Sequence, residues 1–232
     1  GHWTPMNRIN WVERGGFYGN MYGYGAPADS SDQAMIKPLL WIDSKHDRSP
    51  AELLWADSRR WGPLDGSLLS LSYGHGRIFV VMTQFFDRTR QGAAVALPVP
   101  PFPTGIIRGR FNSRDGQLYV LGMSAWATNQ MMQVGGLYRV RYTGRPLHLP
   151  IAMKARTSGI ELTFASPVDR AAVKAEAFTV TVWDLERSST YGSKRHNLRT
   201  LRVGRVTSSL DGRTALLQVP DLAPTWVVEV AY

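Results

Sequence analysis

The chain contains no cysteine, and this absence removes several kinds of chemistry at once. Disulfide bonds, zinc–thiolate sites and the C-x-x-C-H haem attachment all need cysteine, so none of them is expected within this chain. Long apolar segments are also missing, because the longest run, at residues 93–103, is short and interrupted by proline. A membrane-spanning helix needs about 20 apolar residues, so we expect no membrane span.

Several catalytic signatures are absent as well. The five histidines show neither an H-x-x-x-H nor an H-E-x-x-H spacing, and the sequence has no G-x-S-x-G elbow, P-loop or dinucleotide-binding fingerprint. These motifs position metal ligands, nucleophiles or phosphates. Metalloprotease, α/β-hydrolase, P-loop and Rossmann-type functions are therefore not expected.

Positive charge is in excess, with 27 Lys and Arg against 18 Asp and Glu and a formal net charge of +9. The excess is spread over both halves of the sequence, and pairs such as Arg59-Arg60 do not extend into a long basic block. Nucleic-acid binders usually concentrate their charge on one face or stripe, so we expect no nucleic-acid partner. A broad positive field instead suits an acidic polysaccharide or an acidic redox partner.

The composition favours an all-β fold, because 22 Gly and 14 Pro are typical of a turn-rich protein and 44% hydrophobic residues are ample for a core. The only helical candidates are short, at Pro167–Ala175 and Ser49–Leu54. Between residues 68 and 142, β-type runs at short spacing suggest the meandering blades of a β-propeller. The expected strands are Leu68–Ser72, Arg77–Thr83, Ala93–Val99, Ile107–Asn112, Gln117–Gly122 and Gly136–Tyr142.

The character of the sequence changes after Arg145-Pro146, and we expect a second domain at residues 148–232 after a first at residues 1–147. The pattern G-I-E-L-T-F-x-x-P-V-D, followed by D-G-R-T-x-x-L-x-V-P-D-L, resembles small bacterial immunoglobulin-like β-sandwich domains. The expected strands of this domain are Ile160–Phe164, Phe178–Trp183, Leu201–Thr207, Thr214–Val219 and Trp226–Tyr232.

Two arginines, Arg108 and Arg110, stand at positions i and i+2 of one expected strand. Alternate side chains of a strand lie on the same face, about 7 Å apart. Two parallel guanidinium groups form a clamp for a polyanionic ligand. The alternative is a solvated basic face.

The R-x-R strand, the hairpin S-R-D-G-Q-L-Y-V and the closing strand G-G-L-Y-R-V-R-Y resemble the last blade of soluble quinoprotein glucose/sorbosone dehydrogenase propellers. In that family, paired arginines bind pyrroloquinoline quinone, a tricarboxylate, so the resemblance implies that Arg108 and Arg110 bind this cofactor. It also implies secondary cofactor contacts at His75 and Arg77, in S-Y-G-H-G-R, although a neutral histidine is a weaker partner for an anion than a lysine. An exposed turn histidine is the alternative for His75.

A closer resemblance is to large multidomain proteins of planctomycete-type bacteria, which join such a propeller to a c-type haem domain. It rests on G-H-W-T-P, W-V-x-R-G-G-F-Y-G, R-W-G-P-L-D-G-S-L-L, Y-G-S-K and A-P-T-W, which begin at Gly1, Trp11, Arg60, Tyr191 and Ala223. The resemblance implies an exported protein, periplasmic or at the cell surface. The haem would be carried by a partner domain, and the catalytic base and calcium-binding segment would lie in earlier blades, so no catalytic residue or metal ligand is assigned in this chain.

Blade counting adds a constraint. A blade takes roughly 40–50 residues and a propeller closes with about four to eight blades, whereas residues 1–147 supply only about three. We therefore expect the terminal blades of a six-bladed propeller, completed by a segment outside this chain or by a partner chain. The alternative is that residues 1–147 form a compact sheet domain of another kind.

Three further segments carry candidate side chains. Asp43–Pro50, D-S-K-H-D-R-S-P, offers Asp43, His46 and Asp47 as cation ligands, but hard cations need six or more oxygens, and a solvated turn is the alternative. The aromatic and glycine-rich run Phe17–Tyr24 suits either a stacking platform for a ring or packing between blades. Trp126 with Asn129 is a candidate cap of the channel mouth that the arginines face.

The leading expectation is part of an exported, quinoprotein sugar or alcohol dehydrogenase-like protein that passes electrons to a c-type haem domain. The alternative is a non-catalytic propeller scaffold, or a glycan-binding module that takes a sugar or polysaccharide, in a larger redox or cell-surface assembly.

Overall fold

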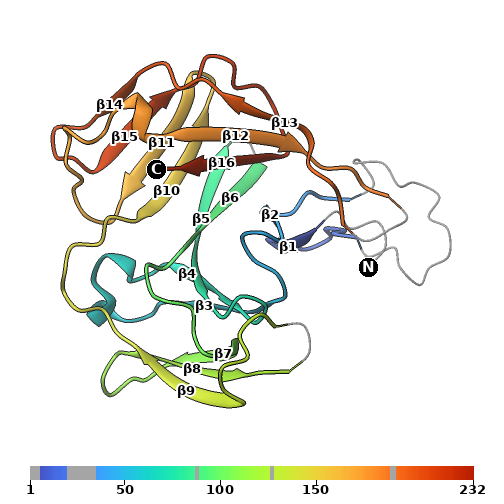
Figure 1. The fold of residues 1–232 in the computed structure, drawn as a ribbon, viewed down its shortest axis with the longest axis vertical. Coiled ribbons are helices and arrows are strands. Elements are labelled where there is room, and N and C mark those ends of the chain that lie inside the picture. Colours follow the sequence, from blue (N-terminus) through green and yellow to red (C-terminus); the bar gives the residue numbers. More distant parts are fainter. Residues whose placement is uncertain (1–5, 20–34, 87–88, 126–127, 189–191) are drawn as a thin grey trace.

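The structure is a computed structural model and describes residues 6–19, 35–86, 89–125, 128–188 and 192–232. The motif at residues 1–5, most of the aromatic run at 17–24, Trp126 and Tyr191 lie outside these residues. The described part is all-β, with strands arranged in five sheets, none of which closes on itself (Figure 1). Its helical content is limited to two short 3₁₀ segments, η1 (Arg59–Leu64) and η2 (Ala175–Ala177).

The first large sheet is a four-stranded antiparallel meander with the order β3-β4-β5-β6. Its strands are β3 (Pro50–Trp55), β4 (Leu68–Ser72), β5 (Ile78–Phe86) and β6 (Thr89–Ala96). All five residues of β4 are buried, as expected of a strand covered on both faces. The sequence prediction of β4 is confirmed, whereas the helical prediction at Ser49–Leu54 is wrong because this segment pairs with β4 as β3.

The second meander has three strands in the order β7-β8-β9, namely β7 (Gly105–Phe111), β8 (Leu118–Met123) and β9 (Gly135–Val140). It packs on the first sheet through one apolar core, to which β4, β5, β7 and β8 contribute buried Leu, Ile and Val side chains. Gly109 allows the two sheets to approach closely, because a Cβ at this position would lie 3.1 Å from Leu71 Cδ1. A small two-stranded sheet of β1 (Asn7–Ile9) and β2 (Leu40–Ile42) lies beside the first meander.

The C-terminal half, residues 148–232, consists of two sheets with a common apolar core. One sheet has the order β10-β11-β15-β14, and the other β13-β12-β16. The strands are β10 (Pro150–Arg156), β11 (Gly159–Phe164), β12 (Thr179–Asp184), β13 (His196–Leu201), β14 (Val206–Ser208), β15 (Thr214–Gln218) and β16 (Val227–Ala231).

Two sequence predictions in the C-terminal half are wrong. The expected strand Leu201–Thr207 is not continuous: Leu201 ends β13, residues 202–205 form a connection, and β14 begins at Val206. The expected helix Pro167–Ala175 is absent from the described residues, where only the single 3₁₀ turn η2 follows it. The Asp169 carboxylate accepts from the Ala171 N–H and closes a local turn, a competing use of the backbone that short polar side chains favour.

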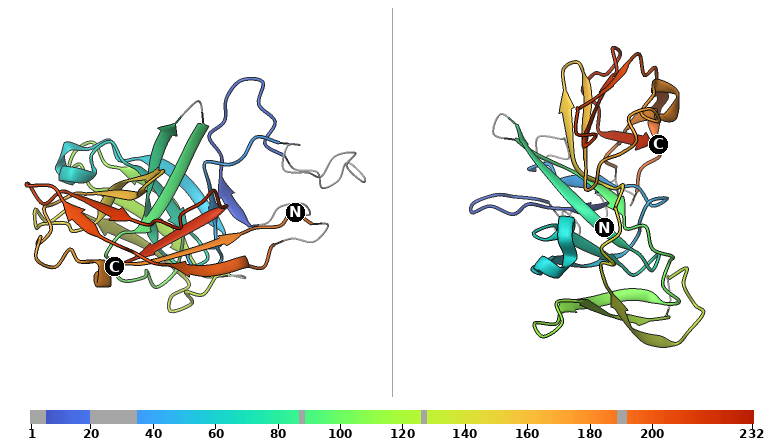
Figure 2. Two further views of the ribbon diagram at one scale, coloured as in Figure 1. Left: turned by 90° about the horizontal axis from the view of Figure 1, so that it is seen from above. Right: turned by 90° about the vertical axis from the view of Figure 1, so that its left-hand side faces the viewer.

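The N-terminal half, residues 6–147, meets the C-terminal half where the long hairpin β5–β6 reaches up beside β10 (Figures 1 and 2). Gln84 on β5 holds this contact, since its Oε1 accepts from the Ala155 N–H at 3.0 Å and its Nε2 donates to the Ala155 carbonyl at 3.4 Å. The side chain thus satisfies the outer backbone groups of an edge strand. No helix of the described residues has the length and hydropathy that crossing a bilayer requires.

Replacing Gln84 with alanine removes both hydrogen bonds to β10 without touching either core. We expect Gln84→Ala to lower the free energy of unfolding by about 1 kcal/mol, because these bonds are partly exposed. We also expect faster amide exchange at Ala155, measured by hydrogen exchange. Gln91→Ala is the matched control, because Gln91 pairs with Gln84 in the register but makes no such contact. Equal effects of the two variants would contradict the assigned role of Gln84.

Candidate functional site

Arg108 and Arg110 lie on the exposed face of β7, while Gly109 between them faces the core. The Arg110 side chain is 74% exposed. Register places Arg110 opposite Tyr119 and Tyr119 opposite Arg139, so a third arginine shares this face. The sequence alone did not predict Arg139 as part of this face, although it placed this residue in the closing strand L-Y-R-V.

Glu52 on β3 links the first strands of the two meanders. Its Oε1 accepts from Arg110 Nη1 at 2.8 Å, and its Oε2 accepts from the Gly109 N–H at 2.7 Å. Desolvation raises the pKa of Glu52, but the hydrogen bonds from Arg110 and Gly109 outweigh this effect. The pKa of Glu52 therefore lies below its usual value. Glu52 is therefore ionised and neutralises part of the arginine charge. It is the second residue that the sequence reasoning missed.

His75 and Arg77 lie apart from this face, in and after the turn between β4 and β5. His75 Nδ1 lies 3.2 Å from Asn129 Nδ2, and His75 Nε2 lies 3.1 Å from the Ser44 carbonyl. These contacts fit a neutral imidazole that accepts at Nδ1 and donates at Nε2. Both His75 and Arg77 line a cleft to which Arg108 and Arg110 do not contribute. The structure thus divides the four predicted cofactor contacts between two places.

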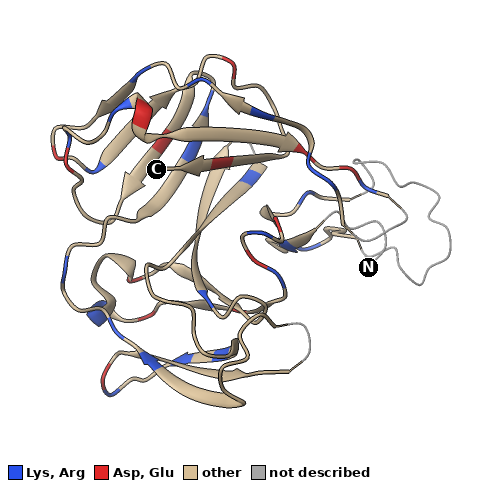
Figure 3. Cartoon of the chain, viewed as in Figure 1, with Lys and Arg blue, Asp and Glu red and all other residues tan. Residues whose placement is uncertain are grey.

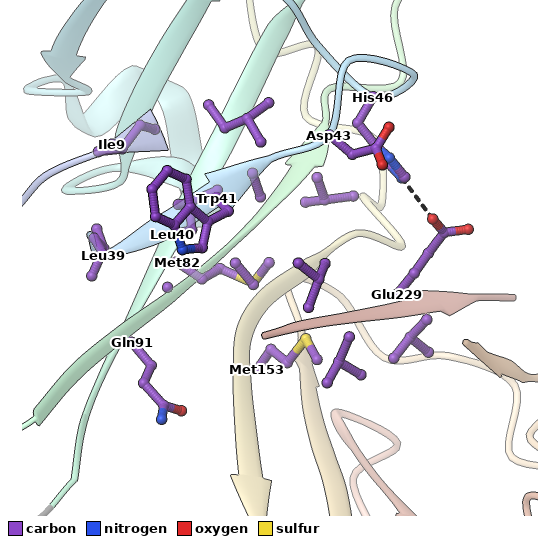
Figure 4. Close-up of a pocket in the computed structure, with 18 of the residues that line it drawn as sticks. Ile9, Leu39, Leu40, Trp41, Asp43, His46, Met82, Gln91, Met153 and Glu229 are labelled. Atoms are coloured by element: carbon purple, nitrogen blue, oxygen red, sulfur yellow. Dashed lines mark ion pairs between the residues drawn. The ribbon is translucent and has the colours of Figure 1, made fainter. Parts of the chain in front are cut away.

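The cleft lies between the two halves and has a volume of about 1050 Å³. β2 and β6 form one wall, and β10 and β16 contribute to the other (Figure 4). At one end, Asp43 and His46 face Glu229 across the cleft, as the labelled side chains show. Leu39, Leu40 and Met82 line its middle.

An ion-pair network closes the polar end of the cleft. Arg195 Nε donates to Asp43 Oδ2 at 2.7 Å, and the Arg195 guanidinium lies 4.2 Å from the ring centre of Trp183. Desolvation raises the pKa of Asp43, but the hydrogen bond from Arg195 brings it below the usual value, and the same bond raises the pKa of Arg195. Both groups therefore stay charged. His46 Nε2 lies 3.6 Å from Glu229 Oε2 and pairs with it when protonated.

Asp47 is the most unusual acid in the cleft, with only 2% of the residue exposed. The Ser72 hydroxyl donates to its Oδ1, whereas its Oδ2 is buried with no hydrogen-bond partner among the described residues. Desolvation raises the pKa of Asp47 to about 6, although the bond from Ser72 acts in the opposite direction.

The segment Asp43–Pro50 contains an exposed turn at residues 44–46, in line with the solvated-turn alternative, but its two acids are buried. Asp43 binds Arg195, His46 faces Glu229, and Asp47 is buried against Ser72. The three side chains have different partners, and no group of three or more His, Asp or Glu in the described part of the chain is placed to hold a metal ion. The segment instead joins the two halves.

Comparison of the chain with protein-family models, with curated proteins and with solved structures found no match. The function is therefore argued from the geometry of the two places described above.

The buried Asp47 predicts a pH-dependent stability. Because its folded pKa of about 6 exceeds the ordinary value of 3.8, ionisation costs about 3 kcal/mol of stability above pH 6, and the cost disappears below about pH 4. We expect Asp47→Asn, which keeps an acceptor for Ser72, to be more stable than the parent at pH 7 by up to this amount. Urea unfolding at pH 4 and pH 7 measures it. A difference that is the same at both pH values would contradict the buried-acid assignment.

Proposed function

We propose that this chain is part of an exported, quinoprotein sugar or alcohol dehydrogenase-like protein, in which Arg108 and Arg110 bind the carboxylates of pyrroloquinoline quinone. The observation that carries the proposal is the exposed face of β7–β9, where Arg108, Arg110 and Arg139 present three guanidinium groups. Guanidinium groups bind carboxylates through paired, charge-assisted hydrogen bonds. Arg108 and Arg110 both stand on the edge strand β7, so they can bind one ligand at that edge of the sheet.

The arrangement of the meanders supports a propeller. β3 and β7 are the first strands of consecutive antiparallel sheets, both lie at a sheet edge, and the Glu52 contacts hold them side by side. In a propeller, the first strand of each blade lines the central channel, so the arginines would reach the cofactor there. We propose likewise that residues 148–232, with sheets of four and three strands, form an immunoglobulin-like sandwich.

The same face of β7–β9 also supports the completion of the ring by further blades of the same protein or a partner chain, which would cover β8 and β9 and leave the edge strand β7 at the channel. Leu121 and Leu137 are register partners on this face, and they are 50% and 66% exposed. Met131, Met132 and Val134 nearby are exposed as well. Clustered exposed apolar side chains typically mark a surface that a partner covers.

In this proposal, the chain binds and orients the cofactor. Glu52 holds Arg110 in place. Arg108 donates to the Ile107 carbonyl, at 2.8 Å, and would bind a cofactor carboxylate instead. The bound quinone supplies the two-electron acceptor for an alcohol or sugar, and a c-type haem on a partner domain receives the electrons. His75 and Arg77 line the separate cleft, so we assign the clamp to the two arginines of β7. No catalytic base is assigned among the described residues.

Calorimetry on the natural full-length protein that carries this chain tests the proposal, with pyrroloquinoline quinone titrated in the presence of calcium. We expect binding in the micromolar range or tighter. Arg108→Ala with Arg110→Ala should raise Kd at least about 100-fold, since each lost charge-assisted bond contributes about 1.5–3 kcal/mol.

The control is Arg114→Ala, in the exposed turn between β7 and β8, which should bind as the parent does. No binding at tens of micromolar, or unchanged affinity of the double variant, would reject the cofactor assignment. The chain would then be the non-catalytic scaffold.

A further inference from the structure

The cleft between the two halves is separate from the proposed cofactor site, because neither Arg108 nor Arg110 contributes to it. We propose that it binds an acidic oligosaccharide, a chain of sugar units that carry carboxylate or sulfate groups. Its volume of about 1050 Å³ is at the upper end of small-ligand pockets, about 300–1,000 Å³. A ligand of several sugar units fits this size.

Aromatic side chains from both walls supply flat apolar surface. Trp41 on β2 and Trp226, just before β16, both line the cleft, with ring centres 6.0 Å apart and planes inclined by 37°. Both side chains are partly exposed. Aromatic rings with this placement suit the apolar C–H face of a pyranose, as they suit other flat groups with polar rims.

Three cations of the cleft are placed to pair with an anionic ligand. Among the acids of the cleft, Asp43 and Glu229 face Arg195 at 2.7 and 3.9 Å, whereas Asp47 and Asp184 accept from neutral groups. By contrast, Lys37, Lys45 and Arg77 line the cleft without a carboxylate within 4.0 Å in the described parts of the chain.

The Lys37 ammonium lies 5.3 Å from the ring centre of Trp226, so one cation stands beside the aromatic surface. Basic residues are also spread over both halves (Figure 3), consistent with the net charge of +9. Carboxylates or sulfates on the sugar units would pair with these free cations.

Calorimetry of the full chain with hexagalacturonate tests the proposal, and a neutral hexasaccharide is the comparison ligand. We expect hexagalacturonate to bind at least tenfold more tightly than the neutral sugar, and 0.5 M NaCl to weaken it. Lys37→Ala with Lys45→Ala should weaken binding at least tenfold. Both residues are exposed, so the variant is expected to fold.

The matched control is Arg170→Ala with Lys174→Ala, which makes the same charge change at exposed positions outside the cleft. It should change Kd less than twofold.

Four outcomes would overturn the proposal: no binding, equal binding of the neutral sugar, equal weakening by the control variant, or equally tight, variant-sensitive binding of polyglutamate. The last would identify a site for acidic peptides. Binding of hexagalacturonate should persist in the Arg108→Ala, Arg110→Ala variant, so failure of one proposal is separable from failure of the other.

Discussion

The ion pair between Asp43 and Arg195 is the constraint on which the arrangement of the two halves depends. It joins a loop of the first half to the residue that precedes β13, across 152 residues of sequence, at a place where the Asp43 side chain is only 5% exposed. Breaking such a pair leaves an uncompensated charge away from water, which is far more costly than losing a surface pair. The halves also touch at Gln84 and in the apolar cluster that contains Trp41 and Trp226, and the cleft lies among these contacts.

The sequence predicted most of the strands for a simple physical reason. A strand that is buried on one or both faces must carry apolar residues in a short run between turns, as in β4 and β8. The prediction failed where the local pattern was compatible with two structures. Ser49–Leu54 has helix-forming residues, but pairing with β4 decides its conformation, and that pairing is a tertiary interaction.

The candidate sites were predictable to a lesser extent. Arg108 and Arg110 could be placed on one face because the two-residue period of a strand is local. Glu52 and Arg139 could not, because they reach the same place through sheet register and through contact between β3 and β7. Asp43, His46 and Asp47 were predicted as candidate cation ligands. Arg195 and Glu229, which Asp43 and His46 face, are far away in the sequence, so the joining role of this loop could not be predicted.

The contact of the β5–β6 hairpin with β10 has a consequence for the solubility of the separated halves. β10 is the end strand of its sheet, and Gln84 occupies its backbone groups at Ala155. An end strand that loses such cover becomes a template for pairing with strands of other molecules. Proteolytic cleavage between the halves would therefore release a C-terminal fragment prone to self-association, so the hairpin also protects the protein against aggregation.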